Sequence, residues 1–152
     1  MIVLQLIDAR FPEKQPTIPG SLKRRIDVCY TCELTEAECD AFSRVLVGLE
    51  RMLKRDITIK AELWTHVLFA GSPLLMFTLD GDSGGAFAPF IIYPVYKWRA
   101  SKYTKEQIIL CMVEELCHCF WSIRDETRVK QKDIEFMKIL GLSLSWPKGH
   151  QF

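Results

Sequence analysis

Two carboxylates and an imidazole lie within five residues of the sequence, at Glu114, Glu115 and His118. In a helix with 3.6 residues per turn, Glu114 and His118 are one turn apart and share a face, with Glu115 beside them. Carboxylate oxygens and imidazole nitrogens are common ligands of divalent metal ions. The spacing therefore predicts a metal site; the alternative is that these residues form only the solvent-facing side of an amphipathic helix.

A helix over residues 104–123 is the element expected to position these groups, with Thr104 as its N-cap. Its apolar residues recur at helical spacing and are expected to face the core: Ile108, Ile109, Met112, Val113, Leu116, Phe120 and Ile123. The opposite side is expected to carry Cys111, Glu114, Glu115, His118 and Ser122. Neither lysine nor arginine occurs from Ile108 to Ile123, so the pattern favours a partly enclosed pocket over an ordinary solvated face.

The remaining pattern predicts an α+β fold. Strands are predicted at 2–7, 26–34, 57–64 and 73–79, and an extended segment at 86–95, where Pro89 and Pro94 restrict it to a sheet edge or break its pairing. A long helix is predicted over 36–55, with Thr35 and Glu38 as a capping box. After the helix at 104–123, a last helix is expected to end near Leu140, with Gly141 as its C-cap.

Two further motifs suggest chemistry that their context does not support. Cys29 and Cys32 form a C-x-x-C pair on a predicted strand, where residues three apart point to opposite faces, so a zinc or redox site is not expected. Residues 81–85 read GDSGG, the pentapeptide around the nucleophile of chymotrypsin-like proteases. His66 is the only upstream histidine and leaves no room for a barrel between, so 81–85 are interpreted as a turn and His66 is given no role.

Length and composition narrow the class of protein. The 152 residues fit one domain, 1–152, and a net charge of +1 with 26% charged residues gives no sign of nucleic-acid binding. The longest apolar tracts are interrupted by proline, glycine or histidine, so no membrane span is predicted. The start of the chain does not resemble a secretion signal, which makes the cytoplasm the expected compartment and reduced thiols the expected state of the six cysteines.

The candidate helix also resembles a known motif. Glu114 to His118 read EELCH, which resembles the H-E-x-x-H helix of zincin metallopeptidases with glutamate in place of the first histidine. Asp125 to Asp133 resembles the segment of small ImmA/IrrE-type zincins that carries an acidic third ligand on the next helix. The resemblance implies a zincin-like fold, in which a long N-terminal helix packs on a small twisted mixed sheet and precedes an active-site helix and a C-terminal helix.

Carried over by position, the resemblance implies that His118 and Glu126 are metal ligands and that Glu115 is the general base. Glu114 occupies the position of the first histidine, where a carboxylate can still bind a metal. Two anionic ligands with one imidazole make bound water less acidic and favour manganese or iron over zinc. Two possibilities therefore stay open: a site for one of these three ions, or no metal site at all. The second is open because Glu126 also fits the N-terminus of a helix, where the helix dipole favours carboxylates.

Two functions follow from these readings. The first is a small metal-dependent hydrolase, a peptidase acting on a peptide or protein. The second is a non-catalytic zincin-like module that holds a peptide or protein partner beside the segment at 86–95. A di-iron centre is not expected, because the sequence lacks the second Glu-x-x-His motif and the four long helices of ferritin-like bundles.

Overall fold

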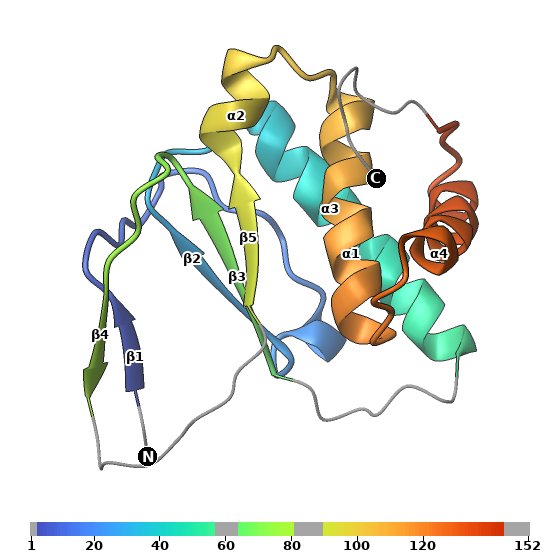
Figure 1. The fold of residues 1–152 in the computed structure, drawn as a ribbon, viewed down its shortest axis with the longest axis horizontal. Coiled ribbons are helices and arrows are strands. Elements are labelled where there is room, and N and C mark those ends of the chain that lie inside the picture. Colours follow the sequence, from blue (N-terminus) through green and yellow to red (C-terminus); the bar gives the residue numbers. More distant parts are fainter. Residues whose placement is uncertain (1–2, 57–63, 81–89, 145–152) are drawn as a thin grey trace.

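The computed structural model describes residues 3–56, 64–80 and 90–144, and these residues adopt an α+β fold (Figure 1). Its strands are β1 (Val3–Leu6), β2 (Ile26–Tyr30), β3 (Thr65–Ala70), β4 (Phe77–Asp80) and β5 (Phe90–Pro94). Its α-helices are α1 (Glu36–Arg55), α2 (Val95–Ala100), α3 (Lys105–Phe120) and α4 (Glu126–Ile139), and one 3-10 turn spans Gly20–Leu22. The helices lie on one side of the central sheet and the β1–β4 pair on the other.

The long helix α1 has the bounds that the sequence predicts. The Glu38 backbone N–H donates to Thr35 Oγ1 at 3.2 Å, and the Thr35 N–H donates to the Glu38 carboxylate at 2.8 Å, which completes the predicted capping box. Its apolar face is fully buried against the sheet, where the Phe42 ring lies 5.0 Å from Phe69 of β3 and 5.8 Å from Tyr93 of β5. These aromatic contacts fix α1 across the strands.

The described strands form two sheets, and the prediction of one mixed sheet is wrong for them. β2, β3 and β5 form a parallel sheet in the order β2-β3-β5, whereas β1 and β4 form a separate antiparallel pair. Parallel strands need a long crossover connection, and α1 lies in the connection between β2 and β3. β5 is an edge strand of this sheet, as its prolines indicated.

The central strand β3 was not predicted. The sequence analysis placed strands at 57–64 and 73–79, but residues 57–63 lie outside the described part of the chain and β4 begins only at Phe77. Between them, Thr65–Ala70 reads THVLFA and is almost entirely buried. A parallel strand covered on both faces needs no alternation of polar and apolar residues, so its pattern carries no period of two.

The helix α3 is buried over more of its surface than a single stripe. It packs against α1, α4 and β5, which buries Leu110 and Cys117 completely in addition to the predicted core residues. Glu114 was expected on the side away from the core, and this is wrong: its exposed fraction is 8% because α4 packs beside it. Glu115 is exposed and His118 half-buried, as an outward position requires.

The remaining features are the ends of α4, the short helix α2 and the state of the cysteines. Asp125 caps α4 by accepting the Arg128 N–H at 2.8 Å, and Gly141, with φ +69°, ends it as predicted. The short helix α2 was not predicted. All six cysteines are free thiols. Within the described segments, every helix is too short or too polar to span a membrane.

Candidate metal centre

Three side chains of the α3–α4 pair converge as the sequence predicted. One ligand atom each of Glu114, His118 and Glu126 lies within 4.8 Å of the others. Glu114 and His118 come from adjacent turns of α3, and Glu126 is the first residue of α4. Glu114 is buried, His118 is half-buried and Glu126 is exposed, so the cluster extends from the core to the surface. We refer to these three residues as the Glu-His-Glu cluster.

The imidazole of His118 is oriented by a backbone carbonyl. His118 Nδ1 lies 2.5 Å from the oxygen of Ile123, and because a carbonyl oxygen can only accept, Nδ1 carries the proton and donates. In a neutral ring, Nε2 is then the nitrogen that can bind a metal, and it lies 3.7 Å from Glu126 Oε1. A hydrogen bond from one ring nitrogen to a carbonyl is the usual way to fix a metal-binding histidine. The His118 ring is therefore oriented with Nε2 toward Glu126.

A third acidic residue, Asp133, lies beside the cluster, and sequence reasoning gave it no role. It is completely buried, and neither of its carboxyl oxygens makes a hydrogen bond within the described residues. Burial raises its pKa to about 7, an effect that the charges of Glu114 and Glu126 reinforce, while the Cys117 thiol and His118 act in the opposite direction. Its position seven residues after Glu126, on the same face of α4, was the signal that could have found it.

Glu115, the predicted general base, lines an open groove instead of joining the cluster. This groove of about 300 Å³ lies between the edge strand β5 and the helices α2 and α3, and it is also lined by Glu114. Its other walls are mostly apolar or aromatic: Ile92, Tyr93, Pro94, Lys97, Trp98, Tyr103 and Cys111. Since Glu114 belongs to both features, the groove leads to the Glu-His-Glu cluster.

The surroundings of the thiols near the cluster favour their protonated form. Burial raises the pKa of Cys111 to about 12, with the charges of Glu114 and Glu115 acting in the same direction. Burial also raises the pKa of Cys117, and the charge of Asp133 adds to it. Metal-binding cysteines are thiolates, which these surroundings disfavour. The three ligand atoms that converge are oxygen and nitrogen atoms.

Elsewhere in the described residues, no other three His, Cys, Asp or Glu side chains come close enough to share a metal ion. His66 Nδ1 lies 3.2 Å from Asp27 Oδ2, and its ring stacks on Phe90 at 4.9 Å. Cys32 lies beyond the end of β2, and the GDSGG segment lies outside the described residues. The chemistry suggested by the sequence is therefore found at the α3–α4 pair.

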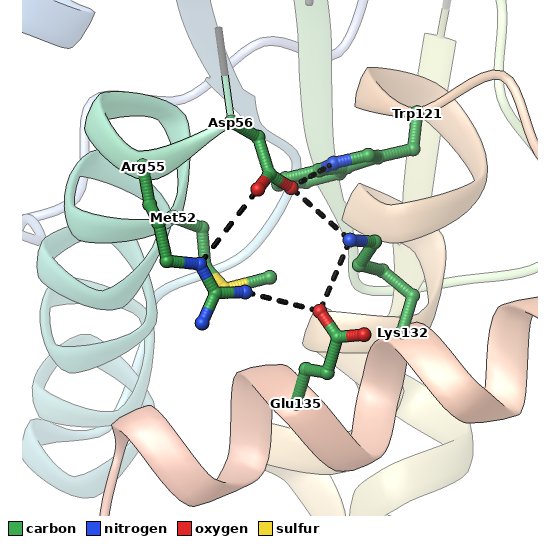
Figure 2. A network of polar contacts seen from close by, with 6 residues as sticks. All are labelled: Met52, Arg55, Asp56, Trp121, Lys132 and Glu135. Atoms are coloured by element: carbon green, nitrogen blue, oxygen red, sulfur yellow. Dashed lines mark hydrogen bonds and ion pairs between the residues drawn. The ribbon is translucent and has the colours of Figure 1, made fainter. Parts of the chain in front are cut away.

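A polar network lies behind the turn that joins α3 to α4 (Figure 2). Asp56, the C-cap of α1, accepts hydrogen bonds from Trp121 Nε1 at 2.8 Å and Lys132 Nζ at 3.1 Å. Glu135 accepts from Lys132 Nζ at 3.1 Å and from Arg55 at 3.0 Å. Burial alone would raise the pKa of Asp56, but the bonds from Trp121 and Lys132 and the nearby cations outweigh it and lower that pKa.

Comparison with protein-family models, with curated proteins and with solved structures gives no match. The argument for function therefore rests on the geometry and chemistry of this chain.

Proposed function

We propose that the protein is a zincin-like metal-dependent hydrolase, acting on a peptide or protein, whose metal ligands are Glu114, His118 and Glu126. The observation that carries the proposal is the convergence of these three ligand atoms within 4.8 Å, with His118 oriented by its Nδ1 bond to the Ile123 carbonyl. The order of elements supports the same class, since a long helix and a small sheet with an edge strand precede the helix that carries EELCH.

A metal ion bound by these residues would supply a Lewis acid that polarises a water molecule or a carbonyl oxygen. With two carboxylates and one imidazole, the ligand set suits manganese or iron better than zinc. Glu115 is next to Glu114 in the sequence and lines the groove without belonging to the cluster. Its role in this proposal is to accept the proton of the attacking water. An extended peptide would pair with the edge of β5 and place its scissile bond above Glu114 and Glu115.

Metal content and activity test the proposal together. Protein purified without chelator is expected to contain close to one equivalent of metal, and the metal-free protein is expected to regain peptide hydrolysis with manganese, iron or zinc. Glu115→Gln should retain the metal and lose activity, whereas Glu106→Gln, an exposed carboxylate on the same helix, should change neither. A metal-free protein that binds none of the three ions would refute the proposal.

A non-catalytic binding module is the second candidate. It is favoured by Glu114 in place of a histidine and by the exposed side chains of Phe90 and Ile92 on the edge strand. In that case Glu115→Gln would leave partner binding intact, whereas Ile92→Glu would abolish it. Loss of the biological activity in Glu115→Gln alone would exclude the binding module.

A further inference from the structure

We propose that Asp56 is a positioning residue for the metal centre, because it holds the α3–α4 turn that orients His118 and presents Glu126. This inference rests on the proposed function, since it concerns how the Glu-His-Glu cluster is kept in a ligand geometry. Asp56 is the C-cap of α1, and it lies 62 residues before His118 in the sequence. We refer to Asp56, Trp121 and Lys132 as the clamp.

The clamp attaches both sides of the turn to a single carboxylate oxygen. Trp121 follows the last residue of α3, and its indole N–H donates to Asp56 Oδ2 at 2.8 Å. Lys132 comes from α4, and its ammonium donates to the same oxygen at 3.1 Å while lying 5.3 Å from the centre of the Trp121 ring. Figure 2 shows the three side chains converging on this point from three helices or helix ends.

The turn held by the clamp contains the group that orients His118. Its residues run from Trp121 to Asp125, and the carbonyl of Ile123 accepts the His118 Nδ1 proton. The turn also leads directly into Glu126, so any shift of this segment moves two of the three candidate ligands. Metal affinity is sensitive to such shifts, since outer partners of metal-binding histidines commonly change it by about 10- to 100-fold.

The backbone of the turn needs to be held. Ser122 has φ +52°, a left-handed conformation that residues other than glycine rarely adopt. Such a conformation persists where the surrounding contacts enforce it, and it is found preferentially at functional sites. Trp121 is adjacent to Ser122, so its bond to Asp56 acts on the segment where the unusual conformation occurs.

The same network offers a matched control. Among the described residues, Glu135 forms its hydrogen bonds with Lys132 and Arg55, and neither partner lies in the turn. Glu135→Gln removes a charge from the network but leaves the direct bond between Trp121 and Asp56. A purely structural role of the network predicts similar effects of changes at Asp56 and Glu135, whereas a positioning role separates them.

The test is to titrate the metal-free protein with Mn²⁺ and with Zn²⁺ and to measure binding by calorimetry. The variants are first shown to be folded by circular dichroism. We expect Asp56→Ala and Trp121→Phe to bind about 10-fold more weakly than the natural chain. Asp56→Asn, which keeps an acceptor for the indole, should recover most of the affinity, and Glu135→Gln should stay within about 3-fold. Trp121→Phe keeps the ring in place, so it remains informative if Asp56→Ala fails to fold.

Three results would overturn the inference in different ways. If the natural chain binds metal and the folded Trp121→Phe variant binds it equally well, the positioning role is wrong while the metal centre stands. If Glu135→Gln weakens binding as much as Asp56→Ala, the network acts only on stability. If the natural chain binds neither ion, the proposed function fails and the inference fails with it.

Discussion

Two polar regions lie at the α3–α4 pair, one with balanced charges and one with an excess of carboxylates. In the network behind the turn, Asp56 is bonded by Trp121 and Lys132, and Glu135 is bonded by Lys132 and Arg55. Around the Glu-His-Glu cluster, three carboxylates gather at a single imidazole, and buried Asp133 makes no hydrogen bond within the described residues. The network around Asp56 already contains its cations, Arg55 and Lys132. The Glu-His-Glu cluster has the composition of a site that binds a cation from solution.

The direction of the pKa shifts expresses the same difference. The pKa of Asp56 is lowered, because bonds from Trp121 and Lys132 outweigh the effect of burial. The pKa of Asp133 is raised to about 7, because burial and two nearby carboxylates disfavour its charge. The surroundings thus favour the charged form of Asp56 and the neutral form of Asp133. This contrast separates the structural network from the candidate metal site.

Removal of the imidazole should break the second region most completely. His118→Ala deletes the only nitrogen ligand, and we expect metal affinity to fall by about 100-fold or more, since even the loss of an outer partner costs 10- to 100-fold. Activity should be lost with it. The measurement is metal titration of the folded variant, and His66→Ala is the control, because His66 lies on the sheet against Phe90. Unchanged affinity in His118→Ala would refute the site.

Asp133 should make the metal-free protein less stable as pH rises. Its folded pKa lies above the ordinary value of 3.8, so its favourable contribution is complete below that value and is lost as pH rises through about 7. We expect a loss on the order of 2–4 kcal/mol between pH 4 and 8, taken from the size of the shift. Asp133→Asn should flatten this dependence. Denaturant unfolding across this pH range checks it, and an equal slope in both proteins would contradict it.

Asp56 should show the opposite sign. Its folded pKa lies below 3.8, so its contribution is present above that value and is lost as pH falls through the folded pKa. Asp56→Ala is expected to destabilise the protein by about 1–2 kcal/mol at pH 7, as for the loss of charged hydrogen bonds. At a pH well below 3.8 the difference from the natural chain should shrink. Chemical unfolding at the two pH values tests this, and a deficit that grows in acid would exclude the assignment.

The smallest effect is expected at Glu135. Its carboxylate is about half exposed and pairs with Arg55 and Lys132 at the surface. Exposed ion pairs contribute little, so Glu135→Gln should cost less than about 1 kcal/mol and lose most of that cost in high salt. The midpoint of thermal unfolding with and without salt provides the measurement. A larger, salt-independent loss would show that the network is less solvated than its exposure indicates.

Sequence reasoning recovered α1, α3 and α4, though not the short α2, because their signals are local. Thr35 and Glu38 were predicted as a capping box and Thr104 as an N-cap, and both caps are present in the structure. Glu114 and His118 follow helical spacing, whereas Glu126 was predicted only from the zincin resemblance. The three come together because the connection between α3 and α4 is short enough to bring the start of α4 back to that turn of α3.

The features that were missed depend on contacts between distant segments. β3 is covered on both faces and shows no alternation, so its role became evident only with its neighbours in place. Asp133 is unusual through burial, which the packing of α4 on α3 creates. The bond between Asp56 and Trp121 joins residues 65 positions apart, and no local pattern encodes it.

The parallel pairing of β2 with β3 also sets the order in which the molecule can fold. Ile26 is paired with Thr65, so this sheet contact requires closure of the long segment that contains α1. The α3–α4 hairpin closes over a five-residue turn. Short closures form faster than long ones. The cluster of candidate ligands is therefore expected to assemble before the sheet is complete, with the Asp56 contact, which comes from α1, added last.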